Sequence, residues 1–135
     1  MRKLIFTALA ATLGLSLSAG ELPIETAAKL VKVVVNGTGG KITCRDAAMK
    51  AALESNGVSV DSSASIIWSS SPAEIKMLKA RGRLIITSRP EQLAMGACIA
   101  IAEDGGRPKI YLHPANLAAS GVSLPDAVLK LGEKI

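Results

Sequence analysis

Apolar residues recur every three to four positions along residues 22–36 (LPIETAAKLVKVVVN), and Lys29 and Lys32 fall on the opposite side. This spacing predicts an amphipathic helix. Glycines follow directly after residue 36 and end the pattern. The next segment, 41–46 (KITCRD), is short and bounded by turn residues, so it predicts a strand.

Short apolar runs typical of buried strands then alternate with helical spacings along the rest of the chain. The expected strands are 41–46, 64–69, 83–88, 97–104 and 108–113. The expected helices are 47–57, 70–82, 114–121 and 124–135, with a short helix or turn at 89–96. This order predicts a three-layer α/β fold: a mostly parallel sheet with helices on both faces, Rossmann-like in topology. The Asp104-Gly105-Gly106 turn predicts a C-terminal antiparallel hairpin.

Residues 1–20 have the three-part plan of a secretory signal peptide. Arg2 and Lys3 precede an uncharged run of 17 residues that ends in small side chains. Cleavage after Gly20 and cleavage after Ser18 both suit a signal peptidase. The alternative is a membrane anchor, for which the run is short against the ~20 apolar residues of a span.

Residues 21–135 are long enough for one packed domain. Loss of the two leader cations lowers the formal net charge from +5 to +3, and the chain has one Trp, one Tyr and one Phe. Such mild charge and scarce aromatic residues argue against nucleic-acid binding. No second apolar run approaches the length of a membrane span.

The glycine-rich segment 33–43 (VVVNGTGGKIT) is not expected to bind phosphate. A phosphate loop runs from a strand into a helix, whereas this segment runs from a predicted helix into a predicted strand. Its spacing also departs from GxxxxGK[ST], because Val35 and Ile42 stand where Gly and Ser or Thr are required. We interpret it as the end of a helix and a turn.

Hydroxyl and arginine side chains follow three of the expected strands. In an open α/β sheet, ligands bind beyond the carboxyl ends of the strands. The candidates for binding a small anion there are Arg45, Ser70, Ser71, Ser88 and Arg89. The alternative is that these residues cap helices or lie on the surface, as such residues commonly do in turns.

Signals for catalysis, metal binding and cofactor binding are weak. His113 is the only histidine, no GxSxG motif is present, and no paired-Cys or CxxCH spacing occurs. The sequence therefore predicts a protein that is not an enzyme, without catalytic residues, metal ligands or a cofactor. Cys44 and Cys98 either form a disulfide, as in many exported proteins, or are two buried thiols.

The segment from Ser65 to the C-terminus resembles the YfiR/HmsC-like family of periplasmic proteins. The resemblance rests on the strands SIIWS and RLIITS, the acidic-Gly turn, KIYLHPANLAASGV and the closing LPDAVLKLG, and the first helix is also similar. It implies a compact periplasmic α/β domain that regulates an inner-membrane diguanylate cyclase by contact with its periplasmic part. Unlike relatives with two disulfides, this chain has only Cys44 and Cys98.

Two functions are thus expected. The first is a periplasmic, non-enzymatic regulator that contacts an inner-membrane sensor or cyclase, and it predicts an exposed aliphatic patch. The alternative is a binder of small anionic ligands at the strand ends, which predicts a pocket with convergent donors. The sequence leaves the oligomeric state open, including a homodimer.

Overall fold

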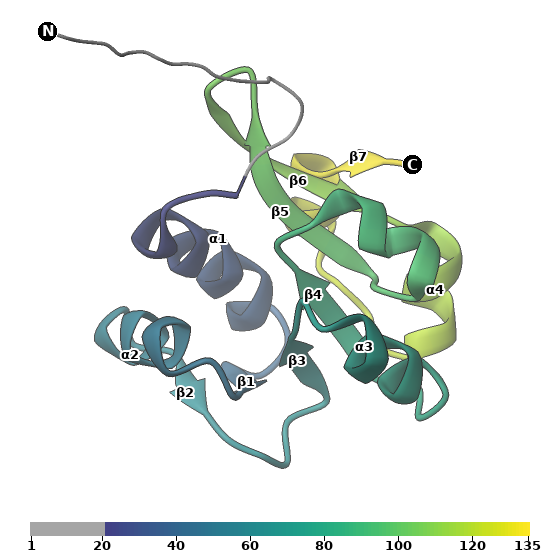
Figure 1. Cartoon of the computed structure of the whole chain (residues 1–135), viewed down its shortest axis with the longest axis horizontal. Coiled ribbons are helices and arrows are strands. Elements are labelled where there is room, and N and C mark those ends of the chain that lie inside the picture. The colour runs from purple at the N-terminus through teal and green to yellow at the C-terminus, as the bar shows by residue number, and fades with distance from the viewer. Residues whose placement is uncertain (1–20) are drawn as a thin grey trace, which may run out of the picture.

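The computed structural model describes residues 21–135, which form one seven-stranded sheet in the order β2-β1-β3-β4-β5-β6-β7 (Figure 1). The strands are β1 (Lys41–Cys44), β2 (Ser59–Val60), β3 (Ile66–Trp68), β4 (Leu84–Thr87), β5 (Ile99–Asp104), β6 (Arg107–Leu112) and β7 (Glu133–Lys134). The helices are α1 (Ile24–Asn36), α2 (Ala47–Ser55), α3 (Pro72–Lys79), the 3-10 helix η1 (Pro90–Met95), α4 (Pro114–Ser120) and α5 (Asp126–Leu131). The predicted signal peptide lies outside the described residues.

Strands β1 to β5 are mutually parallel, and β6 returns antiparallel to β5. The predicted α/β fold is therefore confirmed, including the mostly parallel sheet and the C-terminal hairpin. Because β2 lies on one side of β1 and β3 lies on the other, the winding of the chain reverses direction between β1 and β3. In open α/β sheets this switch point opens a crevice at the carboxyl ends of the two strands.

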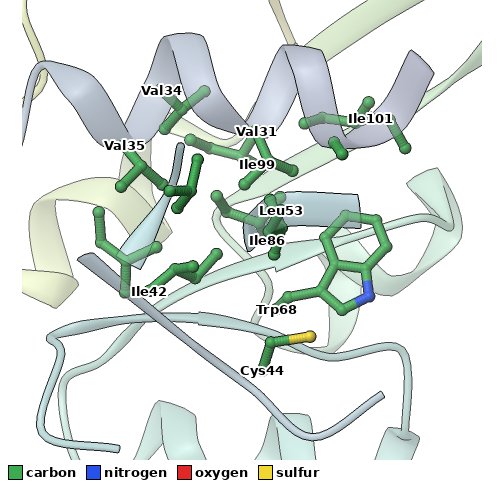
Figure 2. Packing of buried hydrophobic residues seen from close by; sticks show 14 of the residues in the cluster. Val31, Val34, Val35, Ile42, Cys44, Leu53, Trp68, Ile86, Ile99 and Ile101 are labelled. Carbon is green, nitrogen blue, oxygen red and sulfur yellow. The ribbon is translucent and has the colours of Figure 1, made fainter. Parts of the chain in front are cut away.

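Helices cover both faces of the sheet, as Figure 1 shows for α1 and α2 on one side and α3 on the other. Successive strand residues point to opposite faces, so Leu84 and Ile86 pack under α1 while Ile85 packs under α3. Figure 2 shows the first of these cores, where the valines of α1 lie against the isoleucines of β4 and β5. Trp68 of β3 and Cys44 of β1 lie at one end of that core.

Side-chain caps determine where two of the helices begin. The Asp46 carboxylate accepts hydrogen bonds from the amides of Ala48 and Met49 at 3.0 and 3.2 Å, and the Ser71 hydroxyl accepts one from Glu74 at 3.4 Å. These bonds satisfy amides that have no partner within the helix. Both helices also follow directly on a strand, so the caps fix the turns at the carboxyl ends of β1 and β3.

Two short strands were not predicted from the sequence. Strand β2 extends the sheet beyond β1, and β7 pairs with Tyr111 and Leu112 of β6. The predicted helix over 124–135 is consequently wrong over its last four residues, because the helix ends at Leu131 and the chain continues into β7. Two-residue strands carry no alternation long enough to reveal them.

Of the two alternatives for Cys44 and Cys98, the structure shows the second, because both cysteines are buried free thiols and no disulfide joins them. Cys44 ends β1 and Cys98 directly precedes β5, and β3 and β4 lie between these strands. Three spacings of ~4.8 Å separate the two cysteines by about 14 Å. A disulfide needs Cα atoms within ~7 Å, so this sheet order forbids the bond.

Candidate functional site

A cleft of about 560 Å³ opens at the carboxyl ends of β1 and β3, at the switch point of the sheet. Its residues come from α1 and the segment before it, from α2 and α3, from β3 and β5, and from the turns after β1, β3 and β4. They are Glu21, Leu22, Ile24, Ala27, Arg45, Asp46, Met49, Trp68, Ser69, Ser70, Ser71, Glu74, Ser88 and Ile101. The volume lies in the range of small-molecule sites.

The lining of the cleft is both apolar and polar. The apolar side chains are Leu22, Ile24, Ala27, Met49, Trp68 and Ile101, which come mainly from the side of the sheet that α1 and α2 cover. Most polar groups come from the turns that follow β1, β3 and β4, and two carboxylates come from Glu21 before α1 and Glu74 of α3. A ligand with an apolar body and a hydrogen-bonding head would match this lining.

The turn between β3 and α3 supplies three consecutive serines. The Ser69 hydroxyl donates to Glu74 Oε1, and the Ser71 amide donates to Ser69 Oγ at 3.3 Å. In a complete capping box Glu74 would reach back to the amide of Ser71. Here Ser69 stands between them, so only the Ser71 half of such a box forms, and the Glu74 carboxylate turns toward the cleft.

Arg45 extends from the turn after β1, and its guanidinium donates from Nη1 to Glu74 Oε2. The Glu74 side chain is 17% exposed and the Arg45 side chain 69%. This ion pair therefore connects the turns after β1 and β3 across the switch point. The carboxylate is its more buried end.

A buried polar network joins the turns after β3 and β4. Ser70 Oγ lies 2.8 Å from Ser88 Oγ and 3.2 Å from Thr87 Oγ1. Gln92 of η1 donates from Nε2 to the Ser70 carbonyl oxygen at 2.8 Å and accepts from Thr87. Thr87 and Gln92 are fully enclosed, so these bonds hold Ser70 and Ser88 in fixed positions.

Arg89 lies outside the cleft lining and forms an ion pair with Glu21, with 3.4 Å between Nε and Oε2. Glu21 also accepts from the Ser88 hydroxyl at 3.2 Å. The segment before α1 is thereby joined to the turn after β4 at the rim of the cleft.

Four of the five residues predicted to bind ligand line this cleft: Arg45, Ser70, Ser71 and Ser88. The structure brings them together, whereas Arg89 contributes only through Glu21. The sequence placed Glu74 within the helix expected over 70–82 and Trp68 within the strand expected over 64–69, but it marked neither as a site residue. It offered no signal that Glu74 would contact Arg45, 29 residues away in the chain.

The described residues show no arrangement for catalysis by the single histidine or for metal binding. His113 precedes α4, where its Nδ1 accepts from the Asn116 amide at 3.1 Å, so it serves as a helix cap. Among residues 21–135, no cluster of three His, Cys, Asp or Glu side chains could hold a metal ion. Within the same residues, no helix has the length and apolar character needed to cross a membrane.

No family model and no curated protein matches the sequence. Similar solved structures include a conserved domain protein from Vibrio cholerae, with a TM-score of 0.61 and 14% identity over 91% of this chain. Another is the ABC domain in complex with L-Trp from Streptococcus pneumoniae, with a TM-score of 0.59 and 14% identity over 90% of this chain. This chain spans 62% and 64% of those chains, respectively. At this identity the likeness shows a shared α/β fold.

Proposed function

We propose that this protein binds a small amphipathic molecule in the cleft at the switch point of its sheet. The observation that carries the proposal is the cleft itself, about 560 Å³ in volume and lined by apolar side chains and by fixed serine hydroxyls. Such a combination provides burial for the body of a ligand and orientation for its polar head. The enclosed Thr87 and Gln92 support this function, because they hold two of the hydroxyls ready before any ligand arrives.

The ligand can be sought by thermal shift and calorimetry with small amphipathic metabolites. L-Trp is the first probe, because the similar domain from Streptococcus pneumoniae was solved with it. A ligand that binds only the folded state adds about 2.7 kcal/mol of stability at a hundredfold excess over Kd.

A blocked cleft provides the control for that search. Ser88→Trp places a bulky side chain at the cleft, whereas Ser123→Trp places one at an exposed position outside it. We expect Ser88→Trp to remove the stabilisation by a true ligand and Ser123→Trp to preserve it. Equal binding by both variants would place the ligand elsewhere, and a library that stabilises neither parent nor variant would contradict the proposal.

A second function is regulation of an inner-membrane sensor, such as a diguanylate cyclase, by a periplasmic protein of the YfiR/HmsC-like type. Besides the sequence resemblance, one observation favours it. Leu131 and Ile135, with 60% and 61% exposure, flank β7 at an edge of the sheet. Exposed aliphatic side chains that lie close together are a feature that partner proteins use.

Crosslinking in the native host followed by capture and mass spectrometry tests this second function. Recovery of one inner-membrane sensor with the parent protein, and its loss with Leu131→Lys plus Ile135→Lys, would support it. Val33→Lys is the matched control, because Val33 is also exposed but lies on α1. Recovery of only a second copy of this chain would indicate a homodimer instead.

A further inference from the structure

The polar end of the cleft already contains an anion that belongs to the protein. The Glu74 carboxylate accepts from the Ser69 hydroxyl and from the Arg45 guanidinium, at the beginning of α3. A helix N-terminus, a serine hydroxyl and a guanidinium are the donors that protein sites use to bind carboxylate, phosphate or sulfate groups. In this structure the serine hydroxyl and the guanidinium both bind a carboxylate of the same chain, which lies in the first turn of α3.

We propose that Glu74 sets the charge selectivity of the cleft by occupying the place where an anionic ligand would bind. This inference rests on the proposed ligand-binding function and assigns the ligand to a class. The ligand has an apolar body and a neutral or cationic head, in contrast to the anion expected from the sequence. Glu74 is thus a specificity-determining residue.

The other charged groups around the cleft also disfavour an anionic ligand. Arg89, the second candidate for binding an anion, is engaged by Glu21. Asp46 also lines the cleft, and its Oδ1 is bound by two amides of α2. The lining thus holds three carboxylates and one arginine, and that arginine is paired.

An entering anion would therefore have to separate the Arg45–Glu74 pair. Its charge would also stand close to the displaced Glu74 carboxylate, and like charges in a partly enclosed site repel more strongly than in water. A neutral or cationic head meets neither cost. A cationic head can donate hydrogen bonds to the serine oxygens of the turn, and a neutral head can donate or accept them.

Removal of the Glu74 charge should convert this end of the cleft into an anion site. We expect Glu74→Gln and Glu74→Ala to bind sulfate about tenfold or more tightly than the parent, the equivalent of one charge-assisted hydrogen bond. The measurements are the thermal shift at constant ionic strength and saturating changes in the amide NMR signals of Ser69 to Ala73. Glu25→Ala is the matched control, because Glu25 lies in the first turn of α1 and outside the lining.

A gain of sulfate binding in both Glu74 variants and not in Glu25→Ala would support the inference. Equal sulfate binding by the parent and the Glu74 variants would overturn it. This readout does not depend on the natural ligand.

Two probes of similar size test the charge selectivity separately from the ligand-binding function on which it rests. Phenethylamine carries an ammonium group and 3-phenylpropionate carries a carboxylate on the same aromatic body. We expect the parent to bind the amine at least about tenfold more tightly and Glu74→Gln to narrow this ratio. Tighter binding of the acid by the parent, at a site that Ser88→Trp blocks, would overturn the charge selectivity while leaving the ligand function intact. Binding of either probe that Ser88→Trp leaves unchanged would overturn the ligand function itself.

Discussion

The thiol of Cys98 donates to the carbonyl oxygen of Asn116, 3.3 Å away, and has no route to Cys44. Burial, the largest cause in each case, raises the pKa of both cysteine thiols. The neutral thiol is therefore the form that the folded protein favours, and thiolate chemistry is suppressed at neutral pH. The two cysteines therefore serve as packing residues in the protein interior.

Thiol titration checks this conclusion. Non-reduced protein should show two thiols in denaturant, and the native protein should react about tenfold or more slowly at pH 8 because the thiolate is disfavoured. Each thiol has a raised pKa in the folded state, so its contribution to stability is constant below the pKa of the unfolded thiol, ~8.5. It decreases as the pH rises above that value. Cys44→Ala and Cys98→Ala should each remove part of this alkaline decrease, and an absence of free thiols in denaturant would contradict the structure.

At the scale of elements, the side chains that cap the helices also shape the turns that line the cleft. Asp46 ends the turn after β1 and begins α2, so one side chain serves the helix and also lines the cleft. Its bonds to two amides stabilise α2, and its charge contributes to the negative balance of the lining. Substitution can separate the two roles.

Asp46→Ala should lower the free energy of unfolding by about 1 kcal/mol, because two amides of α2 lose their acceptor. Asp46→Asn should cost only a few tenths of that amount, since an amide oxygen also caps a helix. Urea denaturation measures both. Equal losses in the two variants would show that the charge of Asp46, and not its hydrogen bonds, stabilises the fold.

The sequence was sufficient for elements whose signals are local. Apolar periodicity indicated α1, and the alternation of strand-like and helical segments indicated the parallel core. Contacts between residues far apart in the sequence could not be predicted from such local patterns. The separation of Cys44 from Cys98 follows from strand order, and the contact between Arg45 and Glu74 requires β1 and β3 to be neighbours. Three serines and one arginine of the cleft were found because the edge where parallel strands end is itself a consequence of fold class.

For the molecule as a whole, both edges of the sheet are closed by strands of two residues, β2 and β7. Short edge strands offer few unpaired backbone groups to other chains. The bonds at the β7 edge include Ile135 N to the Leu112 carbonyl oxygen at 2.9 Å and the ion pair of Lys109 with Glu133 at 2.6 Å. Without β7, the six residues of β6 would form the edge.

Truncation before Glu133 should therefore lower the thermal midpoint and promote self-association, because Tyr111 and Leu112 of β6 lose their strand partner. Size-exclusion chromatography with light scattering measures the association as a function of concentration. Glu133→Gln with Lys134→Gln retains the strand and removes its charges, so it should remain like the parent. A truncated protein as stable and as dispersed as the parent would show that β7 is dispensable.

The Glu21–Arg89 ion pair restricts where a label can be attached to this protein. It places Glu21 at the rim of the cleft, so in a protein prepared without residues 1–20 a purification tag or fluorophore attached directly before Glu21 would compete with ligands for the same space. A label after Ile135 would instead lie beside β7 at the edge of the sheet. The exposed Arg81, in the turn that leads into the amino end of β4, lies at the other end of that strand from the cleft. A reporter dye on Arg81→Cys, in a background without the two native cysteines, would leave both surfaces free.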